Sequence, residues 1–174
     1  LFNDGENSDD SSKWEFLKWQ YSLNHLGKEI HMCMEGYCSA YIYWYLKRFY
    51  GLMGDTDKRS PTSEGEITKN GYIMAHYAQY ATETTRIKAV TNNEEVCATA
   101  YWDEKTGEVT IVLLNLNGAS QWLEIPLAGI KKASGVETNE TKNMEVIDTG
   151  LMESAEGITV LLSANSITSV RLTF

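Results

Sequence analysis

The feature that most constrains this chain is a change in hydrophobic periodicity near residue 85. Before this point, apolar residues recur every three or four positions or form one short continuous run, which is typical of helices and of a fully buried strand. After it, short segments alternate between apolar and polar residues and are separated by turn residues, a pattern typical of an antiparallel β-sandwich. We therefore expect residues 1–84 and residues 85–174 to fold as different classes of structure.

The first part predicts a long amphipathic helix. Ser12 followed by Glu15 fits a capping box at its start, and Gly36 fits a C-terminal stop. Between them, apolar residues recur at helical spacing: Phe16, Trp19, Leu23, Leu26, Ile30 and Cys33. A second helix is expected from about Lys69 to Glu83.

Residues 38–46 lie between these helices and predict a strand that is apolar on both faces, as in a parallel sheet or barrel. Helix and buried strand together are the repeating unit of a (β/α)8 barrel. A long loop follows, up to about Thr68, and loops of this length are usually functional.

The second part predicts a series of short strands and a hairpin loop at residues 103–108, where Gly107 can adopt positive φ. The expected strands are Arg86–Thr91, Val96–Trp102, Val109–Leu116, Gln121–Ile125, Met144–Ile147, Ile158–Leu162 and Ser169–Phe174.

Charge and composition exclude several classes of function. The formal net charge is -9, and positive residues form no cluster larger than two, so we expect neither a nucleic-acid partner nor an anionic membrane partner. No apolar run is long enough to span a bilayer. The histidines His25, His31 and His76 have no ligand spacing, so we expect no metal and no cofactor. Cys33 and Cys38 can meet if the chain turns at Gly36, or they can remain buried free thiols.

Local sequences in the first part carry a family resemblance. Residues 40–46 (AYIYWYL), then Arg48 and Tyr50-Gly51, then residues 65–72 (GEITKNGY) resemble glycoside hydrolase family 30. In that family, a last barrel strand leads to an R-x-Y-G segment, and a K-x-G-Y stretch opens the final helix. The resemblance implies that residues 1–84 are the C-terminal end of a TIM (β/α)8 barrel and that residues 85–174 are a β-sandwich side domain.

Within the family, the resemblance is greatest to the glucuronoxylan-specific xylanases. It implies that Arg48 binds the glucuronic-acid branch of xylan, because a guanidinium matches a carboxylate with two hydrogen bonds. The alternative is a solvated arginine that pairs with Asp55 or Asp57. Trp44 is expected at the mouth of the barrel as the wall of a sugar subsite, or else packed inside it.

Tyr43 and Tyr50 complete the candidate substrate-binding set. Tyr43 points to the other face of the expected strand, where packing against helices is the alternative. Tyr50 is a candidate for hydrogen bonding within the loop.

A retaining glycosidase needs two carboxylates, one nucleophile and one acid/base. In the family these are glutamates near the ends of the fourth and seventh barrel strands, and Leu1-Phe2 resembles the sequence that directly follows the second one. We therefore assign no catalytic residue, Glu6 included, and expect the chain alone to be inactive. Its expected partners are the missing N-terminal part of the barrel and xylan with glucuronic-acid branches.

The resemblance thus implies a fragment of an endo-β-1,4-xylanase from an extracytoplasmic bacterial setting. A competing hypothesis is a non-catalytic carbohydrate-binding β-sandwich, with Trp102 and Trp122 as stacking platforms. The apolar run at residues 40–46 argues against it, because a sandwich alone has no use for such a strand.

Overall fold

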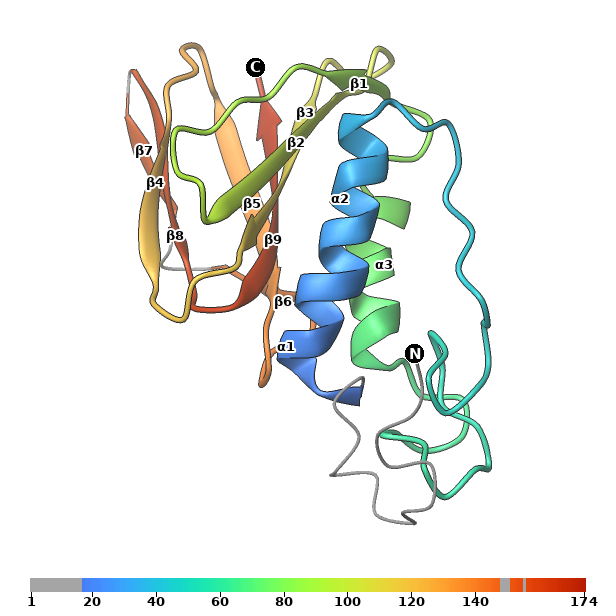
Figure 1. Cartoon of the computed structure of the whole chain (residues 1–174). Coiled ribbons are helices and arrows are strands. Elements are labelled where there is room, and N and C mark those ends of the chain that lie inside the picture. Colours follow the sequence, from blue (N-terminus) through green and yellow to red (C-terminus); the bar gives the residue numbers. More distant parts are fainter. Residues whose placement is uncertain (1–16, 148–150, 155) are drawn as a thin grey trace.

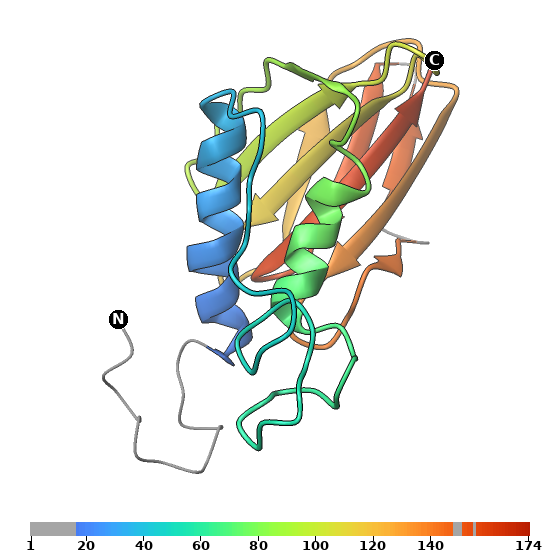
Figure 2. The same cartoon turned by 90° about the vertical axis from the view of Figure 1, so that its right-hand side faces the viewer.

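The computed structural model of the chain describes residues 17–147, 151–154 and 156–174. They form three layers: two helices, a six-stranded antiparallel sheet and a three-stranded antiparallel sheet (Figures 1 and 2). The predicted capping box at Ser12 and Glu15, and also Glu6, lie outside the described residues.

The first helix consists of α1 (Trp19–Ser22), a π-helical turn η3 (Leu23–Gly27) and α2 (Lys28–Glu35), which follow one another without a break. Its predicted apolar stripe is confirmed between residues 19 and 30, since Trp19, Leu23, Leu26 and Ile30 are buried. The helix ends at Gly36, as predicted.

The second helix, α3 (Lys69–Ala78), ends five residues before the predicted Glu83. Two side chains explain this early stop, because they bond to main-chain oxygens at its end. Thr82 Oγ1 donates to the carbonyl oxygen of Ala78 (2.7 Å), and Thr84 Oγ1 donates to that of Ala81 (2.6 Å). Such side-chain bonds compete with continuation of a helix.

The strands form two antiparallel sheets with the orders β1-β2-β3-β9-β5-β6 and β4-β8-β7. The larger sheet contains β1 (Thr85–Ile87), β2 (Val96–Trp102), β3 (Val109–Asn115), β5 (Lys132–Thr138), β6 (Glu145–Val146) and β9 (Ser166–Thr173). The smaller sheet contains β4 (Gln121–Ile125), β7 (Leu151–Ser154) and β8 (Gly157–Leu162). The sequence pattern predicts neither β5 nor β7, and it extends β1 four residues too far.

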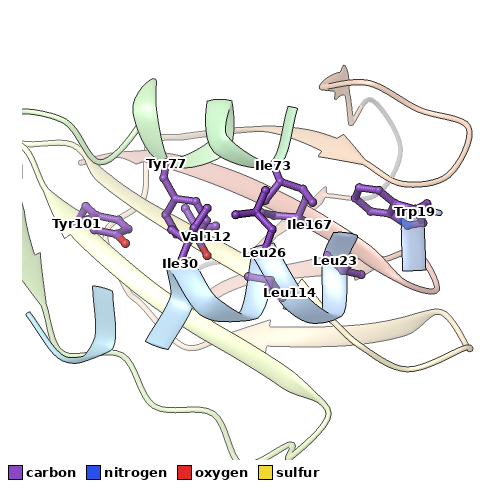
Figure 3. Packing of buried hydrophobic residues seen from close by; sticks show 10 residues of the cluster. All are labelled: Trp19, Leu23, Leu26, Ile30, Ile73, Tyr77, Tyr101, Val112, Leu114 and Ile167. Atoms are coloured by element: carbon purple, nitrogen blue, oxygen red, sulfur yellow. The ribbon is translucent and has the colours of Figure 1, made fainter. Parts of the chain in front are cut away.

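The larger sheet is buried on both faces. One hydrophobic cluster lies between it and the helices: Trp19, Leu23, Leu26, Ile30, Ile73, Tyr77, Tyr101, Val112, Leu114 and Ile167 (Figure 3). A second cluster lies between the two sheets and includes Ile111, Leu113, Val160 and Leu172. Successive residues of β3 therefore alternate between the two clusters, as the pleat of a strand requires. The expected boundary near residue 84 falls between α3 and β1, yet the helices and the sheet share one core, so the division into two domains stays a prediction.

The strand predicted at residues 38–46 is not formed, and this part of the prediction was wrong. The segment is an extended coil on the outer side of the helices, away from the larger sheet (Figure 1). A strand needs a neighbouring strand to satisfy its main-chain groups, and the described residues place none beside it. The alternation of faces remains: Tyr41 and Tyr43 pack toward the helices, whereas Ile42, Trp44 and Leu46 are exposed.

Candidate substrate-binding site

The four residues predicted to bind substrate lie in this coil and at the start of the loop that follows it. Trp44 is 69% exposed and Arg48 is also exposed, whereas Tyr43 and Tyr50 are half-buried. The structure therefore brings the four together along one short stretch of chain, near the N-terminal end of α3 (Figure 1).

An aromatic cluster, formed by Trp44, Tyr45, Phe49 and Tyr50, builds this region. The ring centroids of Trp44 and Tyr45 are 4.0 Å apart with planes tilted by 40°. Tyr45 lies 6.2 Å from Tyr50, and Phe49 meets Tyr50 edge to face at 4.7 Å. The spacings of Tyr45–Tyr50 and Phe49–Tyr50 lie within the range in which aromatic rings attract one another, and that of Trp44–Tyr45 lies just below it. Neither Tyr45 nor Phe49 is among the residues predicted to bind substrate, and only the bend of the chain brings Tyr45 to Tyr50.

Arg48 lies beside this aromatic cluster, with its guanidinium carbon 5.8 Å from the Tyr45 ring centroid. The pairing with Asp57 considered as an alternative is not formed. Arg59 instead binds that carboxylate with two bonds, Nε to Oδ1 at 2.8 Å and Nη2 to Oδ2 at 2.5 Å. These bonds lower the pKa of Asp57 to about 2. No ion pair of Arg48 occurs among the residues that the structure describes.

Tyr43 holds the loop in place. Its hydroxyl donates to the carbonyl oxygen of Tyr50 (2.9 Å), and Asn70 Nδ2 donates both to the Tyr43 hydroxyl and to the same carbonyl oxygen (3.2 Å each). Burial raises the pKa of Tyr43, so the phenol stays neutral and keeps donating. Tyr43 thus positions Tyr50 here, and its contact with substrate stays a prediction. Asn70 belongs to the K-x-G-Y stretch, which was the only sequence signal that pointed to it.

The loop is fastened to the start of α3 as well. Thr68 donates from Oγ1 to the carbonyl oxygen of Gly51 (2.7 Å) and from its main-chain N–H to that of Leu52 (3.0 Å). The Leu52 N–H in turn donates to the carbonyl oxygen of Tyr45 (3.2 Å). The aromatic cluster is therefore tied through main-chain bonds to a helix that is anchored in the core.

A separate cavity of about 540 Å³ lies at the other end of the helices, where α2 and α3 terminate. Its lining includes Tyr37, Cys38, Tyr77 and Arg86, and it shares no residue with the aromatic cluster. The Nε and Nη1 atoms of Arg86 are buried there without a hydrogen-bond partner in the described part of the chain.

No metal centre accompanies the candidate site within residues 17–147, 151–154 and 156–174, where no three His, Cys, Asp or Glu side chains gather closely enough to hold an ion. In the same ranges, no helix has both the length and the apolar character to cross a membrane.

Sequence comparison finds relatives among xylan-degrading enzymes. Glucuronoxylanase XynC of Bacillus subtilis strain 168 is 30% identical over 157 residues, which are 87% of this chain and 34% of that protein. A second glucuronoxylanase XynC from Bacillus subtilis is 30% identical over 143 residues, or 31% of its length. No family model matches the chain.

Solved structures share the fold. Xyn30A, a glycoside hydrolase family 30 subfamily 8 xylanase from Clostridium acetobutylicum, superposes with a TM-score of 0.78 at 21% identity and covers 91% of this chain and 40% of its own. A GH30 endoxylanase from Clostridium papyrosolvens C71 has a TM-score of 0.72 at 22% identity and covers 95% and 39%.

The helical layer packed on an antiparallel β-sandwich is thus a fold that these solved structures share over about two fifths of their length. These comparisons support the expected resemblance to a C-terminal portion of a glycoside hydrolase family 30 xylanase. The fold class expected from the sequence is confirmed. The chain spans about a third of the length of the curated relatives that it matches.

Proposed function

We propose that this chain is the substrate-binding part of a retaining endo-β-1,4-xylanase that cleaves glucuronoxylan outside the cytoplasm. In this proposal both catalytic glutamates lie in the N-terminal part of the barrel, and the chain acts together with that part. The chain alone is inactive, because retaining hydrolysis needs two carboxylates. The name of the curated relatives, glucuronoxylanase, supports the substrate class.

The observation that carries the proposal is that Arg48 is exposed and forms no ion pair in the described residues. Its guanidinium carbon lies 5.8 Å from the Tyr45 ring centroid. Asp57 is near enough that the charge of Arg48 contributes to lowering its pKa. The nearby Asp57 already holds Arg59 through two bonds. An arginine supported by an aromatic ring and left without an ion-pair partner is suited to bind a carboxylate from outside the chain, and the glucuronic-acid branch of xylan supplies one.

Trp44 fits a sugar subsite beside it. Trp44 is 69% exposed and has the Tyr45 ring beside it at 4.0 Å, so much of this aromatic residue is accessible to a pyranose. A rigid aromatic face gives contact area at a low cost in side-chain entropy. In the proposal, Trp44 binds the xylan backbone and Arg48 binds its branch.

The test compares initial rates on glucuronoxylan and on xylan without acidic branches, using the complete enzyme. Arg48→Ala should lower kcat/KM on glucuronoxylan roughly 10- to 100-fold, because it removes charge-assisted hydrogen bonds, and should leave the unbranched substrate unaffected. Arg48→Lys should retain part of the activity.

Lys47→Ala is the matched control. It removes a positive charge from the adjacent position, where the ammonium pairs with Glu64 at 2.6 Å, and should not change the ratio of the two rates. Equal losses on both substrates, or no loss with Arg48→Ala, would contradict the role of Arg48.

A second candidate function is non-catalytic binding of xylan by the sandwich. Trp122 favours it, because this residue is 53% exposed on the edge strand β4. Trp102 is 41% exposed but belongs to the other sheet, so the two do not share a sheet face. Unchanged rates with Arg48→Ala, combined with lost retention on insoluble xylan with Trp122→Ala, would support this candidate instead.

A further inference from the structure

The turn that ends α2 brings two cysteines together. The N–H of Tyr37 donates to the carbonyl oxygen of Met34 (3.2 Å), and that of Cys38 donates to the carbonyl oxygen of Cys33 (2.9 Å). Tyr37 has a left-handed φ of 57°. These two bonds and this dihedral define a Schellman motif, in which the last residue of the turn folds back over the residue five positions before it. Cys38 and Cys33 occupy those two positions.

This geometry suits a disulfide. Side chains at these two positions of a Schellman motif are frequently in contact, and a disulfide requires Cα atoms within about 4.4–6.8 Å of each other. Both cysteines are free thiols in this structure. Burial raises the pKa of Cys33, and the neighbouring Cys38 thiol raises it further.

We propose that Cys33 and Cys38 form a reversible disulfide when the protein meets an organic disulfide such as oxidised glutathione. The bond joins the C-terminal end of α2 to the start of the coil that carries Trp44. The proposal concerns the helix end alone and does not depend on the activity of the enzyme.

The two thiols differ in their access to the oxidant. Cys38 is exposed and lines the open cavity between the helix ends, whereas Cys33 is half-buried. The Cys38 thiolate therefore attacks first and releases one glutathione thiolate, which leaves a mixed disulfide on Cys38. The Cys33 thiolate then attacks the Cys38 sulfur and releases the second glutathione. The protein loses two protons and two electrons, and the oxidised glutathione becomes two thiols.

Peptide mapping of the complete protein tests this assignment. The native protein is treated with oxidised glutathione, its remaining thiols are blocked, and it is digested with trypsin and a glutamate-specific protease. Cleavage at Lys28 or Glu29, at Glu35 and at Lys47 places the two cysteines on separate peptides, residues 29–35 or 30–35 and residues 36–47. We expect these peptides to remain linked, with a mass two hydrogens below the sum of the reduced pair, and to separate after reduction.

Serine variants establish the order of the steps. Cys33→Ser should accumulate a stable glutathione adduct on Cys38, because the resolving thiol is gone, and Cys38→Ser should react slowly. Cys97→Ser is the matched control, since Cys97 lies half-buried on β2, and it should leave the linked peptides unchanged. Separate adducts on Cys33 and Cys38 without a link, or a link through Cys97, would overturn the proposal.

Discussion

At the scale of single residues, Gly71 shows how closely the site is packed against the first turn of α3. A Cβ atom at this position would lie 2.3 Å from the carbonyl oxygen of Leu52 and 2.6 Å from the Cγ2 atom of Ile67. Only glycine lets the loop carbonyl approach the helix this closely. The same loop carries Arg48 and Tyr50. The position of these two residues therefore depends on Gly71 having no side chain.

We expect Gly71→Ala to destabilise the protein by about 2 kcal/mol, because the strain of overpacking exceeds the gain in helix propensity. Urea unfolding of the wild type and the variant measures the difference. Gly118→Ala is the control, because no heavy atom lies within 4 Å of a Cβ built at that position. If both variants unfolded at the same urea concentration, the close approach at Gly71 would not matter for stability.

At the scale of elements, Thr68 joins the start of α3 to the loop before it. Its Oγ1 accepts a hydrogen bond from the Gly71 N–H (3.2 Å), which caps the helix, and donates one to the carbonyl oxygen of Gly51 (2.7 Å). The residue is only 3% exposed. One hydroxyl therefore satisfies a free N–H of the helix and holds the loop at the same time.

Thr68→Ala should lower the free energy of unfolding by about 1–2 kcal/mol, because it removes a helix cap and leaves a buried carbonyl without its partner. Thr68→Ser keeps the hydroxyl and should stay close to the wild type. Thermal unfolding monitored by circular dichroism compares the two. A serine variant as unstable as the alanine variant would show that the methyl group, and not the hydroxyl, carries the effect.

At the scale of the whole molecule, His76 links the helical layer to the sheet. The residue is completely buried on α3; its Nδ1 lies 2.8 Å from Ser169 Oγ on β9, and its Nε2 lies 2.9 Å from Thr138 Oγ1 on β5. Burial lowers its pKa to about 3. His31 on α2 is also buried, and burial lowers its pKa too. Burial thus disfavours the protonated form of both histidines in the native state.

The sign of the pH dependence follows from this burial. Below the ordinary histidine pKa of about 6.5, His76 binds a proton in the unfolded chain but not in the native protein, so acid favours unfolding. His76 alone should cost about 2 kcal/mol of stability between pH 7 and pH 5. Its contribution is present in full above pH 6.5 and falls as the pH decreases toward 3.

Urea unfolding at pH 7, 6 and 5 measures this dependence. His76→Gln should reduce its slope, whereas the control His25→Gln, at an exposed position, should not. The slope that remains in His76→Gln is expected to reflect His31 and the other titrating groups. An unchanged slope in His76→Gln would mean that the histidine is protonated in the native state.

Local periodicity was enough to predict the buried stripe of the first helix and several strands of the sandwich. The strands Val96–Trp102 and Gln121–Ile125 were predicted residue for residue as β2 and β4. These segments carry their signal within a few adjacent positions, because a helix or a half-buried strand sorts its side chains with a fixed repeat. The motif around Trp44 and Arg48 could likewise be recognised in the sequence, because its residues are consecutive or nearly so.

Only the tertiary structure decided which segments become strands and how Arg48 is placed. β5 has a weak pattern around Gly135 and exists because it pairs along its whole length with β9. Residues 40–46 have the pattern of a buried strand but lack a neighbouring strand in the described chain, so their main chain forms no ladder. The exposed state of Arg48 is set by the conformation of its loop, in which Arg59 binds the carboxylate of Asp57. The sequence by itself determined which faces are apolar. Hydrogen-bond partners far along the chain decided which segments become strands, because main-chain groups need partners, and the folded loop decided that Arg48 stays exposed.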